Sequence, residues 1–122
     1  MLKQFEKYIQ NQNLCSQKDK ILLAISGGTD SIVLLHLFSL TNFNFALAHC
    51  NFNLRGKESD GDEAFVKELA QQYNVESHFI SFDTKTYAKE YKLSIEMAAR
   101  ELRYNWFKEL CIKNNYSKIA IG

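Results

Sequence analysis

The 122-residue sequence contains no proline, only five glycines and only three cysteines. Without proline, the breaks between helices and strands must come from glycine and polar turns. An odd number of cysteines with no CxxC pair disfavours both a disulfide scaffold and a zinc ribbon. So few cysteines suit a reducing compartment, and we expect a cytoplasmic protein.

An excess of charge of one sign and long apolar runs are also absent. The sequence has 15 basic and 14 acidic residues and a net charge of +1, which gives no general attraction to nucleic acid. A polynucleotide partner would therefore need a local patch or another domain. The polar first 20 residues do not resemble a signal peptide, and no apolar run is long enough to span a membrane. We expect a single domain over residues 1–122 with no membrane contact.

What the sequence does have is a regular alternation of two apolar patterns. Continuous or alternating apolar runs predict strands at 21–25, 43–50, 75–82 and 118–122. Helical spacing predicts helices at 2–12, 31–40 with its first turn at Asp30–Ser31, 62–73, 83–91 and 94–115, and a long polar loop over 51–61. This order predicts an α/β fold with a doubly wound parallel sheet and right-handed crossovers. In such sheets ligands bind beyond the carboxyl ends of the strands.

The segment SGGTDS, residues 26–31, stands between the first strand and the helix that follows it. A glycine turn that opens a helix presents free amides and partial positive charge to an anion, most often a phosphate. Ser26, Thr29 and Ser31 add hydroxyl donors, and Asp30 suits a magnesium ion that bridges to phosphates. Neither the Walker A pattern nor the dinucleotide fingerprint fits, because no lysine follows and position 31 is serine.

SGGTDS resembles the S-G-G-x-D-S loop of the N-type ATP pyrophosphatases. Within that group, AHCNFNLRGKESDGDEAFV at 48–66 and SIEMAARELRYNWF at 94–107 are similar to segments of the tRNA(Ile)-lysidine synthetase family. The three segments occur in the order and at the spacing typical of that family. One departure is Phe52, where the family commonly has histidine, so any polar contact made by that imidazole is missing.

The resemblance implies a Rossmann-like, adenine nucleotide alpha hydrolase-like fold that uses ATP and Mg²⁺. In this family ATP activates C2 of cytidine 34 in the tRNA(Ile) anticodon through an adenylated intermediate and releases pyrophosphate. The amine of free lysine then displaces AMP and forms lysidine. The implied partners are therefore tRNA(Ile) and lysine.

Candidate site residues follow from the loop and from the resemblance. The nucleotide-binding candidates are Ser26, Gly27, Gly28, Thr29, Asp30, Ser31, Ala48, His49, Cys50 and Arg100. Asp30, also the metal ligand, and Arg100 are the catalytic candidates, and Arg55, Glu96 and Arg103 are the substrate-binding candidates. For Glu96 and Arg100 a solvated i,i+4 ion pair is the alternative; for Arg55 it is an exposed loop charge. His49 could act as a base, but a structural or backbone role is the preferred interpretation.

Two other functions remain open on the sequence. One is tRNA 2-thiolation, which generally uses paired cysteines and is disfavoured by their absence. The other is a nucleotide-binding module that does not turn ATP over. Because the family continues beyond the fourth strand, we expect a truncated, N-terminal part of the ATP-binding catalytic domain that is inactive alone. An uncovered edge on strand 118–122 would favour a homodimer.

Overall fold

The computed structural model describes residues 20–41 and 43–121, so the predicted helix over 2–12 lies outside the described residues. The elements along the chain are β1 (Lys20–Ala24), α2 (Thr29–Ser39), β2 (Asn44–Asn51), α3 (Lys57–Gln72), β3 (Ser77–Ser81), α4 (Thr84–Glu90), α5 (Ile95–Asn114) and β4 (Lys118–Ile121). Within the described ranges, no helix has the length and apolar character needed to cross a membrane.

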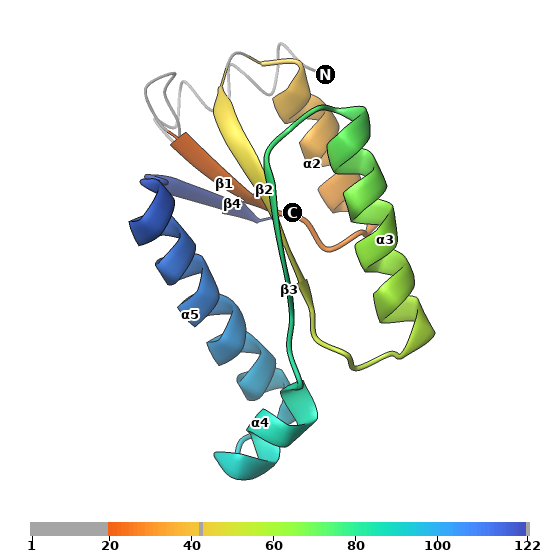
Figure 1. The fold of residues 1–122 in the computed structure, drawn as a ribbon, viewed down its shortest axis with the longest axis vertical. Coiled ribbons are helices and arrows are strands. Elements are labelled where there is room, and N and C mark those ends of the chain that lie inside the picture. The colour runs from red at the N-terminus through yellow and green to blue at the C-terminus, as the bar shows by residue number, and fades with distance from the viewer. Residues whose placement is uncertain (1–19, 42, 122) are drawn as a thin grey trace.

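The four strands form one parallel sheet in the order β3-β2-β1-β4. Helices α2 and α3 cover one face and α5 covers the other (Figure 1). The predicted doubly wound α/β fold is therefore confirmed. Strand order reverses at β1, which lies between β2 and β4, and the carboxyl end of β1 is thus the topological switch point.

The core explains why the first strand has no polar alternation. Ile21 and Leu23 are fully buried on the face covered by α2 and α3. Leu22, also fully buried, points to the opposite face and packs with Trp106 and Phe107 of α5. A strand buried on both faces needs apolar residues at every position.

One boundary differs from the sequence prediction by five residues. α3 begins at Lys57 rather than at residue 62, so the polar loop after β2 is much shorter than predicted. Gly56 caps the helix at a φ of 56°. Glu58 and Asp60 lie in the first turn, where acidic side chains are favoured by the helix dipole. The polar residues that indicated a loop are therefore the exposed first turns of α3.

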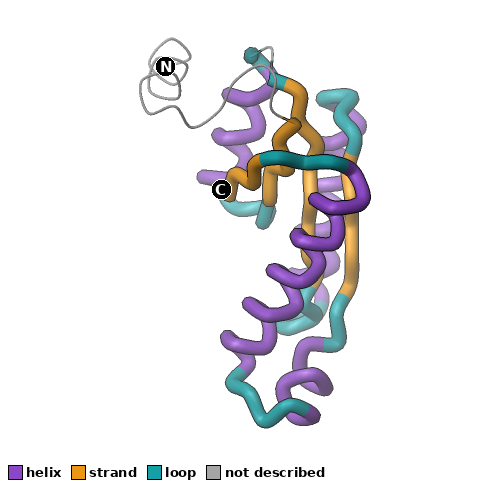
Figure 2. The backbone as a smooth tube through the Cα atoms, turned by 90° about the vertical axis from the view of Figure 1, so that its left-hand side faces the viewer, coloured by secondary structure: helices purple, strands orange, loops and turns teal. Residues whose placement is uncertain are grey.

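Helices α4 and α5 begin with side-chain caps, as the sequence predicted for α4. The Asp83 carboxylate accepts a hydrogen bond from the amide of Thr86 at 3.3 Å, and the Ser94 hydroxyl accepts one from Met97 at 3.1 Å. The two helices pack against each other, and α4 with the first turns of α5 extends beyond the carboxyl ends of the strands (Figure 2). β4 is an edge strand of the sheet, and a homodimer formed through it stays a prediction.

Candidate functional site

The loop after β1 turns sharply within two glycines. Gly27 has a φ of 94°, and Gly28 is extended and caps α2. The hydroxyl of Ser26 accepts a hydrogen bond from the Gly28 amide at 3.3 Å. The hydroxyl of Ser31, almost fully buried, donates to the Gly28 carbonyl at 2.9 Å. Ser31 thus stabilises the turn from inside, while Thr29 and Asp30 open the helix, where the first amides have no intrahelical acceptor.

The close neighbour of Gly27 is Asp62, from α3. A Cβ atom at Gly27 would lie 3.3 Å from the Cβ of Asp62 and 3.5 Å from its Oδ1. Position 27 therefore requires glycine for its backbone conformation and offers little room for a side chain. The sequence analysis did not select Asp62, although it belongs to the acidic part of the segment that carries the family resemblance.

A cavity of about 320 Å³ lies at the carboxyl ends of β1 and β2. This volume is at the lower end of the range for small-molecule sites. Six predicted site residues line it: Ser26, Ala48, His49, Cys50, Arg55 and Arg103. Asp62, Phe52 and Phe107 also contribute to the wall. Of the other predicted residues with described side chains, Glu96 and Arg100 are exposed on α5 and are not part of the wall.

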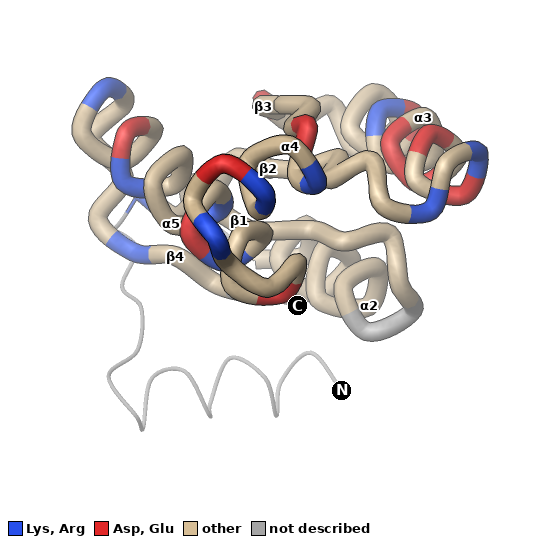
Figure 3. Tube along the Cα trace, turned by 90° about the horizontal axis from the view of Figure 1, so that it is seen from below, with Lys and Arg blue, Asp and Glu red and all other residues tan. Residues whose placement is uncertain are grey.

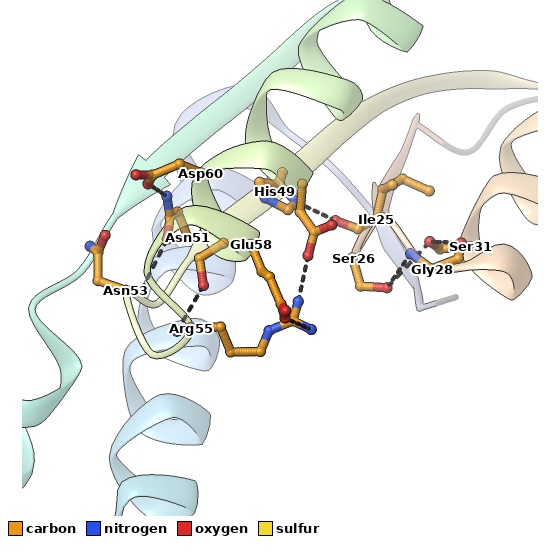
Figure 4. A network of polar contacts seen from close by, with 12 residues as sticks. Ile25, Ser26, Gly28, Ser31, His49, Asn51, Asn53, Arg55, Glu58 and Asp60 are labelled. Carbon is orange, nitrogen blue, oxygen red and sulfur yellow. Dashed lines mark hydrogen bonds and ion pairs between the residues drawn. The ribbon is translucent and has the colours of Figure 1, made fainter.

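His49 joins the ends of the two central strands. Its Nδ1–H donates to the carbonyl of Ile25 at 2.7 Å, and the side chain is only 4% exposed (Figure 4). With the proton on Nδ1, Nε2 carries the lone pair, and this buried atom has no hydrogen-bond partner in the structure. The Nδ1 bond gives His49 a structural role at the junction of the two strands, and it does not exclude a base role for Nε2.

The loop between β2 and α3 is held by two asparagines. The side-chain oxygen of Asn51 accepts from the amide of Asn53 at 3.0 Å, and its nitrogen donates to Asp60 of α3 at 3.0 Å (Figure 4). Asn53 donates to the carbonyl of Phe82 at 2.8 Å, which ties the loop to the end of β3. Phe52 stacks on Phe82 with ring centroids 5.8 Å apart. These contacts fix the loop that carries Arg55.

Arg55 forms ion pairs with Asp62 and, at 3.6 Å, with Glu58. Its side chain is 60% exposed. The pair with Asp62 places a cation and an anion side by side in the cavity wall, next to the glycine turn. Arg55 is therefore more than an isolated loop charge, because its guanidinium balances the carboxylate that lies against Gly27.

Arg103 and Arg100 occupy different surroundings on α5. Arg103 lines the cavity, and its buried Nε has no hydrogen-bond partner in the structure. Both guanidinium carbons lie 5.6 Å from the ring centroid of Tyr104. Among the ion pairs of the described residues there is none between Glu96 and Arg100. Arg103, rather than Arg100, presents an uncompensated cation to the cavity.

Cys50 contributes a neutral thiol to the cavity wall. Burial raises the pKa of this thiol from 9.0 to about 12, although the nearby Arg103 lowers it in part. The group therefore stays protonated at neutral pH, where it is a poor nucleophile and a poor metal ligand. The part of the chain that the structure describes also contains no group of three His, Cys, Asp or Glu residues able to hold a metal ion.

The strand order and the glycine turn at the switch point define a Rossmann-like α/β domain. The model of the PP-loop domain family matches residues 1–122, and the chain belongs to this family. Several curated relatives are named tRNA(Ile)-lysidine synthase. That of Bacteroides thetaiotaomicron is 49% identical over 104 residues, which cover 85% of this chain and 24% of the relative.

Two further relatives carry the same name and confirm the predicted family resemblance. The Chlorobaculum tepidum protein is 44% identical over 124 residues, covering 98% of this chain and 38% of the relative. The Parabacteroides distasonis protein is 48% identical over 110 residues, which cover 90% of this chain and 25% of the relative. The chain thus spans between 24% and 38% of the length of these three relatives.

Proposed function

We propose that this chain supplies the ATP-binding portion of an enzyme that ligates lysine to C2 of cytidine 34 in tRNA(Ile). The observation that carries the proposal is the cavity at the switch point, whose wall brings together Ser26, at the start of the glycine turn, and the two cations Arg55 and Arg103. The relatives named tRNA(Ile)-lysidine synthase support lysidine formation on tRNA(Ile) as the reaction. ATP would activate the cytidine as an adenylate, and lysine would displace AMP.

The phosphates of ATP fit the start of α2. Gly27 and Gly28 carry no side chain at the turn, and the first amides of the helix, together with its dipole, favour an anion there. In the adenylation step negative charge develops on the leaving pyrophosphate, and preorganised amides stabilise such charge without reorganisation. Arg103 lies in the cavity wall, and its guanidinium is suited to a phosphoryl oxygen. Asp30 remains the candidate ligand for Mg²⁺.

The adenine base of ATP would contact a largely apolar wall at β2. The carbonyl of Ala48 already accepts a hydrogen bond from the amide of Ile25 at 3.0 Å, so its backbone is engaged in the sheet. Cys50 and Phe52 present a neutral thiol and an aromatic ring to the cavity. We therefore assign the contact with adenine to the side chains on this wall rather than to a backbone edge.

The cavity argues against 2-thiolation as the chemistry. Sulfur transfer from a cysteine requires a nucleophilic thiolate or persulfide. Cys50 is the cysteine in the cavity wall, and its pKa of about 12 keeps it protonated. The neutral thiol is better explained as a packing group beside the nucleotide.

The direct test uses the intact protein with ATP, a tRNA(Ile) transcript and radiolabelled lysine. We expect AMP and pyrophosphate release that depends on the transcript, and label in the RNA that disappears when cytidine 34 is replaced. Arg103→Ala should reduce pyrophosphate release by about 10²- to 10³-fold, the usual cost of losing a transition-state donor. The control is Lys108→Ala, an exposed cation on the same helix.

Two results would contradict the proposal. ATP binding without release of AMP or pyrophosphate would identify a nucleotide-binding module that has no ligase activity. Pyrophosphate release without incorporation of lysine would leave an adenylating enzyme with a different second substrate.

A further inference from the structure

The molecule has two oppositely charged sides, whose charges largely cancel to give the net charge of +1. From the start of α4 to the end of α5, residues 84–114 hold seven Lys or Arg and four Glu, a net charge of +3. α3, residues 57–72, holds two Lys and five Asp or Glu, a net charge of −3. The two charged segments lie on opposite sides of the sheet, as seen from its carboxyl edge (Figure 3). The candidate cavity lies between them, because its wall includes Asp62 of α3 and Arg103 of α5.

The cations of the α4–α5 side form no ion pairs with carboxylates of the described residues. None of the ion pairs formed by described residues involves α4 or α5. Arg100 and, on α4 and in the turn after it, Lys85, Lys89 and Lys92 are exposed. Unpaired cations on a surface attract a polyanion, whereas the acidic α3 side repels it.

Tyr104 links this basic surface to the cavity. Tyr104 is 47% exposed, and the guanidinium carbons of Arg103, in the cavity wall, and of Arg100, outside it, each lie 5.6 Å from its ring centroid. Arg100 and Tyr104 are four residues apart on α5, so they share one side of the helix. The three side chains form a continuous path from the cavity to the outer surface, which we call the α5 rim.

We propose that the α5 rim is the surface along which an RNA strand enters the cavity. An exposed tyrosine is a stacking platform for a base, and adjacent guanidinium groups neutralise the phosphates on either side of that base. The RNA would pass over Arg100 and Tyr104 while the target nucleotide enters at Arg103. This inference rests on the proposed function for the identity of the polyanion, but not for the position of the surface.

The test measures binding of a fluorescein-labelled RNA stem-loop, with cytidine in its loop, to the intact protein over a series of salt concentrations. Tyr104→Ala should weaken binding about tenfold at each salt concentration, because it removes stacking. Arg100→Gln should weaken binding and reduce the slope of log K against log salt by about one, because it removes one phosphate contact. Lys67→Gln, the same charge change on α3, should leave both quantities unchanged.

Titration of the same variants with ATP alone separates this inference from the proposed function. ATP affinity should be equal in wild type and Tyr104→Ala. If the protein binds ATP and modifies RNA, but RNA affinity is unchanged in Tyr104→Ala or falls equally in Lys67→Gln, the α5 rim is wrong and the function stands. If RNA binding depends on Tyr104 and Arg100 but no lysine is incorporated, the rim stands and the function is wrong.

Discussion

At the scale of single residues, Gly27 is the position where conformation and packing leave the least freedom. Its φ of 94° is costly for an L side chain, and a Cβ would lie 3.3 Å from that of Asp62. Gly27→Ala should therefore lower the free energy of unfolding by about 1–3 kcal/mol and weaken ATP binding. Urea unfolding and ATP titration measure the two effects.

Gly61 provides a matched control for this prediction. It lies inside α3, and a Cβ there would have no neighbour within 4 Å. Gly61→Ala should raise the free energy of unfolding by about 0.5–1 kcal/mol, because alanine loses less backbone entropy in a helix. If Gly27→Ala matched wild type in both stability and ATP affinity, the glycine turn could not be the fixed phosphate cradle.

Arg55 and Asp62 form an ion pair. A double-mutant cycle can separate the contributions of the two side chains to ATP affinity. The Asp62 carboxylate lies against the turn where phosphates are expected, and Arg55 balances it. Arg55→Ala should weaken ATP binding about three- to tenfold, since the pair is partly exposed. Adding Asp62→Asn should restore most of the loss, because the uncompensated anion is then removed. ATP affinity is measured by calorimetric titration.

The control for this cycle is Glu63→Gln, which removes the adjacent carboxylate, paired with Lys67. It should not change ATP affinity. If the Arg55→Ala and Asp62→Asn effects are losses that simply add, Arg55 contacts the phosphates directly and does not act by balancing Asp62.

At the scale of elements, the features that could be predicted from the sequence are those that depend on a local pattern of residues. The apolar run of β1, the glycine turn and the Asp83 cap of α4 each carry their signal within a few residues. The start of α3 was wrong because it depends on contacts between distant segments. Asn53 reaches Phe82 at the end of β3, and Asn51 reaches Asp60, which together hold a short loop where composition indicated a long one.

The same distinction applies to the candidate site. Parallel strands bring the ends of β1 and β2 to one edge, so the shared location of Ser26, His49 and Cys50 could be predicted. Which of Arg100 and Arg103 reaches the cavity could not be predicted, because it depends on the rotation of α5. Burial of Phe107 fixes that rotation and puts Arg103, one turn earlier, at the cavity. Asp62 was missed because its role comes from packing against Gly27.

At the scale of the whole molecule, burial of two acidic groups links stability to pH. The pKa of the Cys50 thiol is raised from 9.0 to about 12, chiefly by burial. That of the Tyr116 phenol is raised from 10.0 to about 12, again chiefly by burial, with Glu76 adding to the shift. Both lie on the face of the sheet that α5 covers, and the Tyr116 hydroxyl is 2.8 Å from Nε2 of His78. Folding on this face thus favours the protonated forms.

The sign of the pH dependence follows from proton counting. Between about pH 9 and pH 12 the unfolded chain loses these protons while the folded protein keeps them, so the folded state binds more protons. The free energy of unfolding should therefore be insensitive to these groups below about pH 9 and should fall as the pH rises above it. Urea unfolding at a series of pH values measures the slope. Cys50→Ser and Tyr116→Phe should each reduce the slope by the equivalent of about one proton. Equal slopes in wild type and both variants would mean that neither buried group retains its proton in the folded state.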